Sequence, residues 1–192
     1  MRYFAHETAV IDVGASIGAD CKIWHFSHIS SGACVGEGVS LGQNVYIGRD
    51  VVIGAGSKVQ NNVSIFTGVQ LDEHVFCGPS VVFTNVINPR ANIDRKDEYR
   101  QTRIHYGASL GANSTIVCGV TVGQLSLVGA GSVVVSDVRD FALVVGNPAR
   151  QIGWVSAFGV RLDLPLAGEG EAHCSVTGTK YQLTSHGVVM AD

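Results

Sequence analysis

The sequence predicts an all-β fold, a parallel β-helix built from six-residue repeats. An apolar residue recurs at every sixth position through the first half of the chain, and a small or β-branched residue usually follows four positions later. The position just before that second residue is mostly Gly, Asn or Asp, which tolerate a positive φ at a tight corner. A period of six fits neither an amphipathic helix, whose period is about 3.6, nor a hairpin sheet, whose period is about 2. Each repeat is therefore expected to form one short strand and one corner.

Two columns of residues carry this prediction. The first column reads Ile11, Ile17, Ile23, Ile29, Val35, Leu41, Ile47, Ile53, Val59, Ile65, Leu71, Cys77 and Phe83. The second column reads Ala15, Cys21, Ser27, Ala33, Val39, Val45, Val51, Ser57, Val63, Val69, Val75 and Val81. Three repeats can close one triangular coil, with the first column inside and ladder hydrogen bonds between stacked coils. Periodicity alone leaves the handedness of the coils open.

The pattern stops after Phe83 and then resumes. The later inward positions are Ile104, Leu110, Ile116, Val122, Val128 and Val134. In phase, the next repeat would begin at residue 89, so about 15 extra residues leave the coil as one loop, predicted over residues 86–103. The β-helix domain is thus predicted over residues 1–150 and a C-terminal extension over residues 151–192. Residues 174–189 alternate apolar and polar side chains around turn residues, which predicts a small β-hairpin in that extension.

Composition and charge exclude several classes of partner. The 192 residues include 13 basic and 16 acidic side chains, and this net charge of −3 gives no basic excess for nucleic acid or anionic membranes. No uncharged apolar run approaches the roughly 18 residues that span a bilayer, and the first residues do not look like a signal peptide. We therefore expect a cytoplasmic protein with no nucleic-acid and no membrane partner. Five cysteines without CxxC spacing predict reduced, packed thiols.

Several segments depart from the residue types that the repeat alone would require. Such departures suggest a binding or catalytic site. These segments are residues 24–28 (WHFSH), 60–62 (QNN), 78–85 (GPSVVFTN), 88–90 (NPR) and 153–156 (GWVS). The regular repeats, ending in GNPA at residues 146–149, resemble the hexapeptide-repeat acyltransferase superfamily over residues 5–150. The irregular segments resemble, within it, the N-acetyltransferases of UDP-2-acetamido-3-amino-2,3-dideoxyglucuronic acid in bacterial O-antigen (lipopolysaccharide) biosynthesis. The resemblance implies a left-handed β-helix, a homotrimer with sites between subunits, and acetyl-CoA as co-substrate.

Three other functions are known for a β-helix scaffold of this kind or share its pattern. Enzymes that acetylate dTDP-3-amino-3,6-dideoxyhexoses share much of the pattern, so the sugar is less well defined than the reaction. A noncatalytic assembly subunit would have the same scaffold. The γ-type carbonic anhydrases bind zinc with three histidines and need two of them five positions apart, a spacing absent from this sequence, so no metal is predicted.

The resemblance places Asn85 at the reaction centre, where an amide could orient the amine or donate to the oxyanion. The alternative is a corner residue in the left-handed conformation. A histidine base remains a second possibility, and the candidates in or beside the solenoid are His25, His28, His74 and His105.

Binding residues follow from the irregular segments and the repeat. The predicted nucleotide-sugar residues are Trp24, His25, His28, Asn61, Asn62, Phe66 and Arg90. Counting repeats places six residues on one edge of the prism: His25, Gln43, Asn61, Pro79, Ala112 and Ala130. The Gly-Ala pairs there could form a track for coenzyme A, whose predicted contacts are Gly111, Ala112, Gly129, Ala130, Asn147 and Arg150.

The loop concentrates positive charge. It holds five of the 13 basic residues, namely Arg90, Arg95, Lys96, Arg100 and Arg103. Guanidinium groups bind pyrophosphate and carboxylate well, so the loop could close over a substrate. A solvated loop, balanced by Asp94, Asp97 and Glu98, is the alternative.

Overall fold

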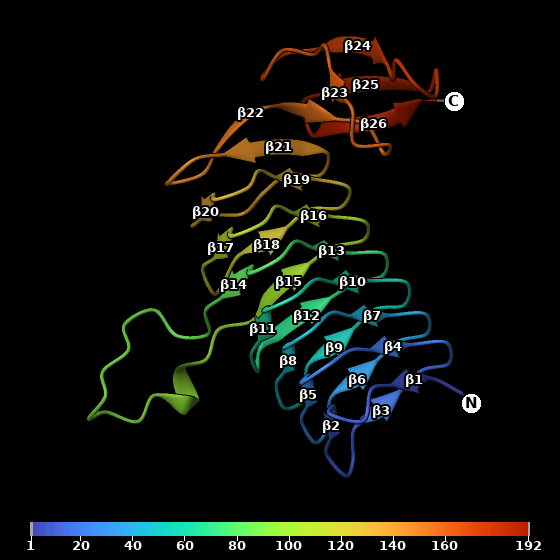
Figure 1. Ribbon diagram of the computed structural model, residues 1–192. Helices are drawn as coiled ribbons and strands as arrows, with labels where there is room; N and C mark the ends of the chain where they lie inside the picture. The colour runs from blue at the N-terminus through green and yellow to red at the C-terminus, as the bar shows by residue number, and fades with distance from the viewer. Residues whose placement is uncertain (1, 192) are drawn as a thin grey trace.

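The computed structural model describes residues 2–191, which form a solenoid of parallel strands with a small antiparallel sheet at its C-terminal end (Figure 1). Three sheets run along the solenoid, and successive strands pass from sheet A to sheet B to sheet C. The N-terminus and the C-terminus lie at opposite ends (Figure 1). The predicted parallel β-helix, with one loop and a C-terminal hairpin, is confirmed.

The strands are mostly two residues long. Sheet A contains β1 (Phe4–Ala5), β4 (Lys22–Ile23), β7 (Ser40–Leu41), β10 (Lys58–Val59), β13 (Phe76–Cys77), β16 (Ser109–Leu110), β19 (Leu127–Val128), β21 (Ala142–Val145), β22 (Arg150–Val155) and β23 (Arg161–Leu162). Sheet B contains β2 (Val10–Ile11), β5 (His28–Ile29), β8 (Tyr46–Ile47), β11 (Ser64–Ile65), β14 (Val82–Phe83), β17 (Thr115–Ile116) and β20 (Val133–Val134). Sheet C contains β3 (Ser16–Ile17), β6 (Cys34–Val35), β9 (Val52–Ile53), β12 (Val69–Leu71), β15 (Thr102–Ile104) and β18 (Thr121–Val122).

Each two-residue strand points its first side chain outward and its second inward, because side chains alternate along a strand. The inward column is therefore the core: Ile23, Ile29, Leu41, Ile47 and their successors are almost fully buried. The corners also follow the prediction. Asn44, for example, has φ 58° one position before the buried Val45.

Four of the five cysteines are buried, but Cys34 is exposed. The prediction that all are packed is thus wrong for Cys34. It is the first residue of β6 and points away from the core, whereas the inward position of that strand is Val35.

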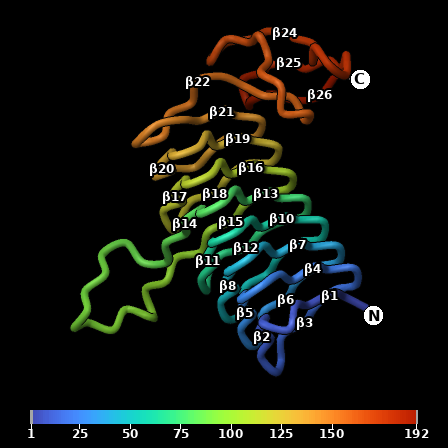
Figure 2. Tube along the Cα trace, in the orientation of Figure 1, coloured from blue at the N-terminus to red at the C-terminus, as the bar shows by residue number. Residues whose placement is uncertain are grey.

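The loop leaves the solenoid after β14 and returns at β15, which pairs with β12. It projects from the side of the solenoid and carries one short 3-10 helix, η1 (Lys96–Glu98) (Figures 1 and 2). Its stem is closed where the Arg100 N–H donates to the Asn85 carbonyl over 2.9 Å.

The C-terminal end of the core is covered by the last strands. After β21 the chain reverses, and β22 and β23 extend sheet A antiparallel, so β22 crosses the boundary placed at residue 150. A separate sheet, the cap sheet, contains β24 (Gly170–His173), β25 (Lys180–Thr184) and β26 (Gly187–Ala191). Its Tyr181 is buried against Phe141. In the described part of the chain no helix is long and apolar enough to cross a membrane.

Candidate functional site

The corners between sheets A and B stack into one continuous edge, the A/B edge. It consists of residues 6–9, 24–27, 42–45, 60–63, 78–81, 111–114 and 129–132. The six residues placed there by counting repeats follow one another along it. The carbonyls of His25, Gln43, Asn61, Pro79 and Ala112 each accept an N–H from the next coil over 2.8–2.9 Å.

Three predicted substrate residues meet at the N-terminal half of this edge. Trp24, His25 and Asn61 line one pocket of about 290 Å³, together with Ser40, Gly42, Gln43, Val59 and Gln60. Trp24 is 41% exposed, and its ring lies nearly parallel to that of His25, which stacks on His6 at 3.6 Å between centroids. The pocket thus combines an aromatic wall with amide and imidazole groups, a lining suited to an uncharged polar ring.

The side chains of Asn61 and Asn62 each form a hydrogen bond to a neighbouring corner of the A/B edge. Asn61 Oδ1 accepts the backbone N–H of Gln43 over 2.9 Å, and Asn62 Oδ1 accepts Asn44 Nδ2 over 3.1 Å. Asn62 also has φ 63°. Both residues therefore have a structural role, and the Nδ2 groups are the part of each amide that stays available for a ligand.

Phe26 stands out on the same edge. It has φ 58° and its side chain is 60% exposed, although the equivalent corners hold Asn44, Asn62 and Asn113. A bulky residue in the left-handed region costs on the order of 1–3 kcal/mol, and such strain is concentrated at functional sites. From the sequence, Phe26 falls outside the inward columns, where an aromatic ring could stack on a nucleobase or pack against another subunit; its positive φ is visible only in the structure.

His28 and Phe66 lie away from this pocket. His28 is on the outer face of sheet B, where its Nε2 is 3.2 Å from Asp12 Oδ1 and its ring meets Tyr46 edge-on. Phe66 follows β11 at the corner between sheets B and C and packs near Tyr46 at 5.9 Å. Trp24, His25, Asn61 and Asn62 therefore lie on the A/B edge, whereas His28 lies on the face of sheet B and Phe66 at its opposite edge.

Four of the predicted coenzyme residues lie on the C-terminal half of the A/B edge, namely Gly111, Ala112, Gly129 and Ala130, whereas Asn147 and Arg150 follow it in the chain. Gly111 and Gly129 begin successive corners, and the turn containing Asn147 stacks on Ser132 and Val133 through hydrogen bonds from Gly146 and Ala149. A side chain at Gly111 would collide with the Ala130 backbone, so stacking alone requires glycine there. Close packing is thus a sufficient reason for Gly111.

Backbone donors are accessible on this half of the edge. The N–H groups of Ala112 and Ala130 have no acceptor among the described residues. At one corner nearer the N-terminus, by contrast, the Asn61 side chain accepts the corresponding N–H of Gln43. Alanine side chains leave these donors open, so they can bind amide carbonyls of an extended ligand.

Arg150 lies beside a larger pocket of about 480 Å³ at the C-terminal end of the solenoid. Its Nη1 donates to the neighbouring Ala149 carbonyl over 2.8 Å, and its side chain is exposed. Arg139 lines the same pocket, but it is engaged by Gln151 and by the Trp154 ring. Arg150 is therefore the more available cation for a phosphate.

Asn85 lies at a different edge, between sheets B and C, where the loop begins. Its carbonyl is held by Arg100, while its side-chain amide has no hydrogen-bond partner within residues 2–191. It is also absent from the residues with positive φ, so a left-handed corner does not account for asparagine here. A fixed backbone with a free amide is an arrangement that suits a catalytic role.

Most of the loop's positive charge is neutralised locally. Arg95 pairs with Glu98 at 2.7 Å, Lys96 with Asp94 at 3.0 Å, and Arg103 with Asp72 at 3.1 Å. Arg90 and Arg100 have no carboxylate partner in the described structure. Arg90, the predicted substrate residue, is exposed and donates only to the Pro89 carbonyl.

One polar cluster was not anticipated. Asp72 Oδ2 is 2.8 Å from His105 Nδ1, and Asp72 Oδ1 accepts from Arg103. Asp72 and His105 lie at the corner between sheets C and A, apart from Asn85, and Arg103 is in the adjoining strand β15. They are about 30 residues apart in sequence, so only the pairing of β12 with β15 across the loop brings them together. Within residues 2–191 no group of three or more His, Cys, Asp or Glu is placed to bind a metal ion.

Comparison with known proteins identifies the repeat. The bacterial transferase hexapeptide family (six repeats) matches residues 14–49, and the hexapeptide repeat of succinyl-transferase matches residues 32–67 and 102–136. The chain belongs to the hexapeptide-repeat superfamily. The matches include coils on both sides of the loop, as expected if the loop is an insertion into one continuous solenoid.

Two curated relatives resemble this hexapeptide-repeat protein over part of their length. The bifunctional protein GlmU of Synechococcus sp. (strain CC9605) is 38% identical over 143 residues, which are 73% of this chain and 29% of GlmU. The dTDP-3-amino-3,6-dideoxy-alpha-D-galactopyranose 3-N-acetyltransferase of Aneurinibacillus thermoaerophilus is 51% identical over 59 residues, 31% of each protein. Each alignment spans less than a third of the relative.

A solved structure is similar over a larger share of its length. The hexapeptide-repeat-containing acetyltransferase of Vibrio cholerae O1 biovar eltor, complexed with acetyl coenzyme A, aligns with a TM-score of 0.57 and 27% identity. The alignment covers 65% of this hexapeptide-repeat protein and 72% of the Vibrio chain.

Proposed function

We propose that this protein is an acetyl-CoA-dependent N-acetyltransferase that acts on the 3-amino group of a nucleotide-linked amino sugar. The observation that carries the proposal is the division of the A/B edge into two halves. One half holds the polar pocket of Trp24, His25 and Asn61, and the other offers the open backbone donors of Ala112 and Ala130. The similarity to a Vibrio acetyltransferase complexed with acetyl coenzyme A supports acetyl-CoA as the co-substrate.

The reaction needs little from the protein beyond placement. The uncharged amine attacks the thioester carbonyl, a C–N bond forms, and the C–S bond breaks. The departing thiolate takes up the proton that the nitrogen loses, which yields an amide and free coenzyme A. Positioning the two reactants is the main contribution, and a neutral donor at the developing oxyanion adds to it. The free amide of Asn85 is the group we propose for that donor.

Asn85 and the coenzyme track lie at different edges of one chain, with sheet B between them. The outward positions of sheet B carry no Asp, Glu, Lys or Arg; they are Val10, His28, Tyr46, Ser64, Val82, Thr115 and Val133. A homotrimer with this uncharged face toward the threefold axis would bring the Asn85 edge of one copy to the A/B edge of the next. We propose that each active site is completed in this way between subunits.

The preferred substrate in this proposal is UDP-2-acetamido-3-amino-2,3-dideoxyglucuronic acid, in O-antigen assembly. Arg90, which has no carboxylate partner in the described structure, supports an anionic sugar. A dTDP-linked 3-amino-3,6-dideoxyhexose is the second candidate, favoured by the 51% identity over 59 residues to an enzyme named for such a sugar. Both substrates and acetyl-CoA are cytoplasmic metabolites, so the proposal includes a cytoplasmic location.

A substrate panel tests the proposal. Purified protein is incubated with acetyl-CoA and UDP-linked or dTDP-linked 3-amino sugars, and thiol release is followed. Release with the UDP-glucuronate derivative is expected, and release with dTDP sugars alone would transfer the assignment to the second candidate. If no sugar releases thiol and calorimetry detects no acetyl-CoA binding, the enzyme proposal is wrong and a noncatalytic assembly subunit remains.

A further inference from the structure

The outer face of sheet A carries a short cationic row beside the polar pocket. Lys22, Ser40 and Lys58 occupy the outward positions of β4, β7 and β10, and they are direct register partners. Neighbouring strands are roughly 4.8 Å apart, so the two lysines are separated by roughly 10 Å with the serine hydroxyl between them. Two ammonium groups on flexible stems can converge across that distance.

Both lysines are available to a ligand. Each is exposed, and neither forms an ion pair with any described carboxylate. By contrast, Arg103, the cation on the outward face of sheet C, is bound to Asp72. The protein as a whole is acidic, with a net charge of −3, so an unpaired cationic pair on a strand face is a local feature.

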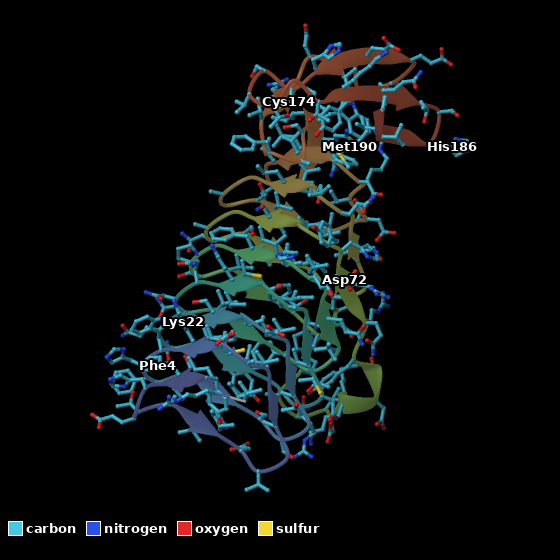
Figure 3. The ribbon with its side chains drawn as sticks, turned by 90° about the vertical axis from the view of Figure 1, so that its right-hand side faces the viewer. Phe4, Lys22, Asp72, Cys174, His186 and Met190 are labelled. Carbon is cyan, nitrogen blue, oxygen red and sulfur yellow. The ribbon has the colours of Figure 1, made fainter. Side chains whose placement is uncertain are left out.

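The row lies next to the groups that would hold the rest of a nucleotide. Ser40 belongs both to the row and to the wall of the pocket formed by Trp24, His25 and Asn61. Exposed phenylalanines close the row at both ends, because Phe4 pairs with Lys22 and Phe76 pairs with Lys58. Figure 3 shows Phe4 and Lys22 near each other at the N-terminal end of the solenoid, with Asp72 on another side.

We infer that Lys22, Ser40 and Lys58 bind the diphosphate group of a substrate, with one of its flanking rings in the pocket beside Ser40. Two ammonium groups match the two charged phosphates, and the hydroxyl can donate to an oxygen between them. The inference rests on the proposed function for its ligand class, since the nucleotide sugar and coenzyme A both contain a diphosphate. The row is on sheet A, away from the sheet B face proposed for trimer contact, so assembly leaves it open.

Calorimetry without turnover tests the inference. UDP, uridine, coenzyme A and pantetheine are titrated into the full-length protein and into the Lys22→Ala and Lys58→Ala variants. We expect each variant to weaken UDP binding by about tenfold, the effect of losing one charge-assisted contact, and to leave uridine unchanged. Lys→Arg at either position should restore most of the affinity. Lys180→Ala is the charge-matched control, because Lys180 is on the cap sheet and pairs with Glu171.

The outcomes separate the two possible sources of the diphosphate. Weaker UDP binding with unchanged coenzyme A binding assigns the row to the nucleotide sugar, and the reverse assigns it to the coenzyme. If neither ligand is weakened relative to Lys180→Ala in a correctly folded variant, the inference is wrong even if acetyl transfer is observed. If UDP binding depends on the lysines but no acetyl transfer is observed, the proposed reaction is wrong and the diphosphate site at Lys22, Ser40 and Lys58 is still supported.

Discussion

Individual residues in this protein are constrained mainly by where they fall in a repeat. At an A/B corner the third residue takes a left-handed conformation, which Asn44, Asn62 and Asn113 adopt at low cost. Phe26 takes the same conformation with an exposed ring and no such compensation. Asn85 is the opposite case, since its φ is not positive and its side-chain amide has no hydrogen-bond partner among the described residues. We therefore expect Phe26 and Asn85 to be retained for function and not for the stability of the repeat.

Asn85→Ala is expected to lower turnover by about a hundredfold, a typical loss for an oxyanion donor, with little change in stability. Steady-state kinetics and thermal unfolding measure the two effects. Asn92→Ala, an exposed asparagine elsewhere in the same loop, is the control and should retain turnover. Equal activity of the two variants would remove Asn85 from the mechanism.

Phe26→Asn is expected to raise the free energy of unfolding by about 1 kcal/mol, because the strained aromatic is replaced by a residue that tolerates positive φ. Nucleotide-sugar binding should weaken at the same time if the ring contacts the ligand. Chemical denaturation and calorimetry report the two changes. The reverse control, Asn44→Phe at the equivalent corner, should lose at least as much stability, because it adds the strain and also removes the Asn44 hydrogen bond to Asn62. An Asn44→Phe protein as stable as the unchanged protein would contradict the strain argument.

At the scale of elements, the cap sheet closes the open end of the core. A solenoid exposes its inward column wherever stacking stops, and terminal elements must cover it. Tyr181 of β25 fills this role: it is buried against Phe141, and its hydroxyl accepts the Ala157 N–H over 2.9 Å. Trp154 of β22 is also fully buried and donates to the Pro165 carbonyl. The extension is therefore a structural part of the solenoid.

Tyr181→Ala is expected to destabilise the protein by about 3–5 kcal/mol, since it removes a large buried ring. Tyr181→Phe keeps the ring and leaves one N–H without its acceptor, so about 1–3 kcal/mol is expected. Val189→Ala on the exposed face of β26 should change stability little. Denaturant unfolding measures all three, and a Tyr181→Ala protein as stable as the Val189→Ala protein would show that the cap sheet is not needed.

At the scale of the whole molecule, the three faces of the prism differ in character. Sheet B is uncharged on its outward positions, sheet A carries Lys22 and Lys58, and sheet C carries Arg103 paired to Asp72. The loop and the A/B edge flank sheet B on opposite sides. A threefold assembly around sheet B would bury the uncharged face and join the two parts of the proposed site.

Val82→Glu is expected to disrupt the proposed trimer, because it places a charge on the face that we propose is buried. Val82 is 49% exposed on sheet B, and its matched control is Val52, which is 42% exposed on sheet C. Sedimentation should show Val82→Glu as smaller species without acetyl transfer and Val52→Glu as intact trimer. A trimeric Val82→Glu protein would place the subunit interface on another face.

The sequence by itself determined the repeating strand and corner, the inward column, the loop and the order of residues along the A/B edge. These follow from a local period of six, because every coil repeats the same alternation of outward and inward side chains. The same counting placed Lys22 beside Ser40 and Lys58, a signal that sequence reasoning left unused. Counting also places Asn85, one repeat after Pro79, on the next edge. Only the tertiary structure decided that Asp72 meets His105 across the loop and that Tyr181 closes the core. Those contacts depend on how the insertion changes the register and on how the C-terminal strands fold back, and neither is encoded in the period of the repeat.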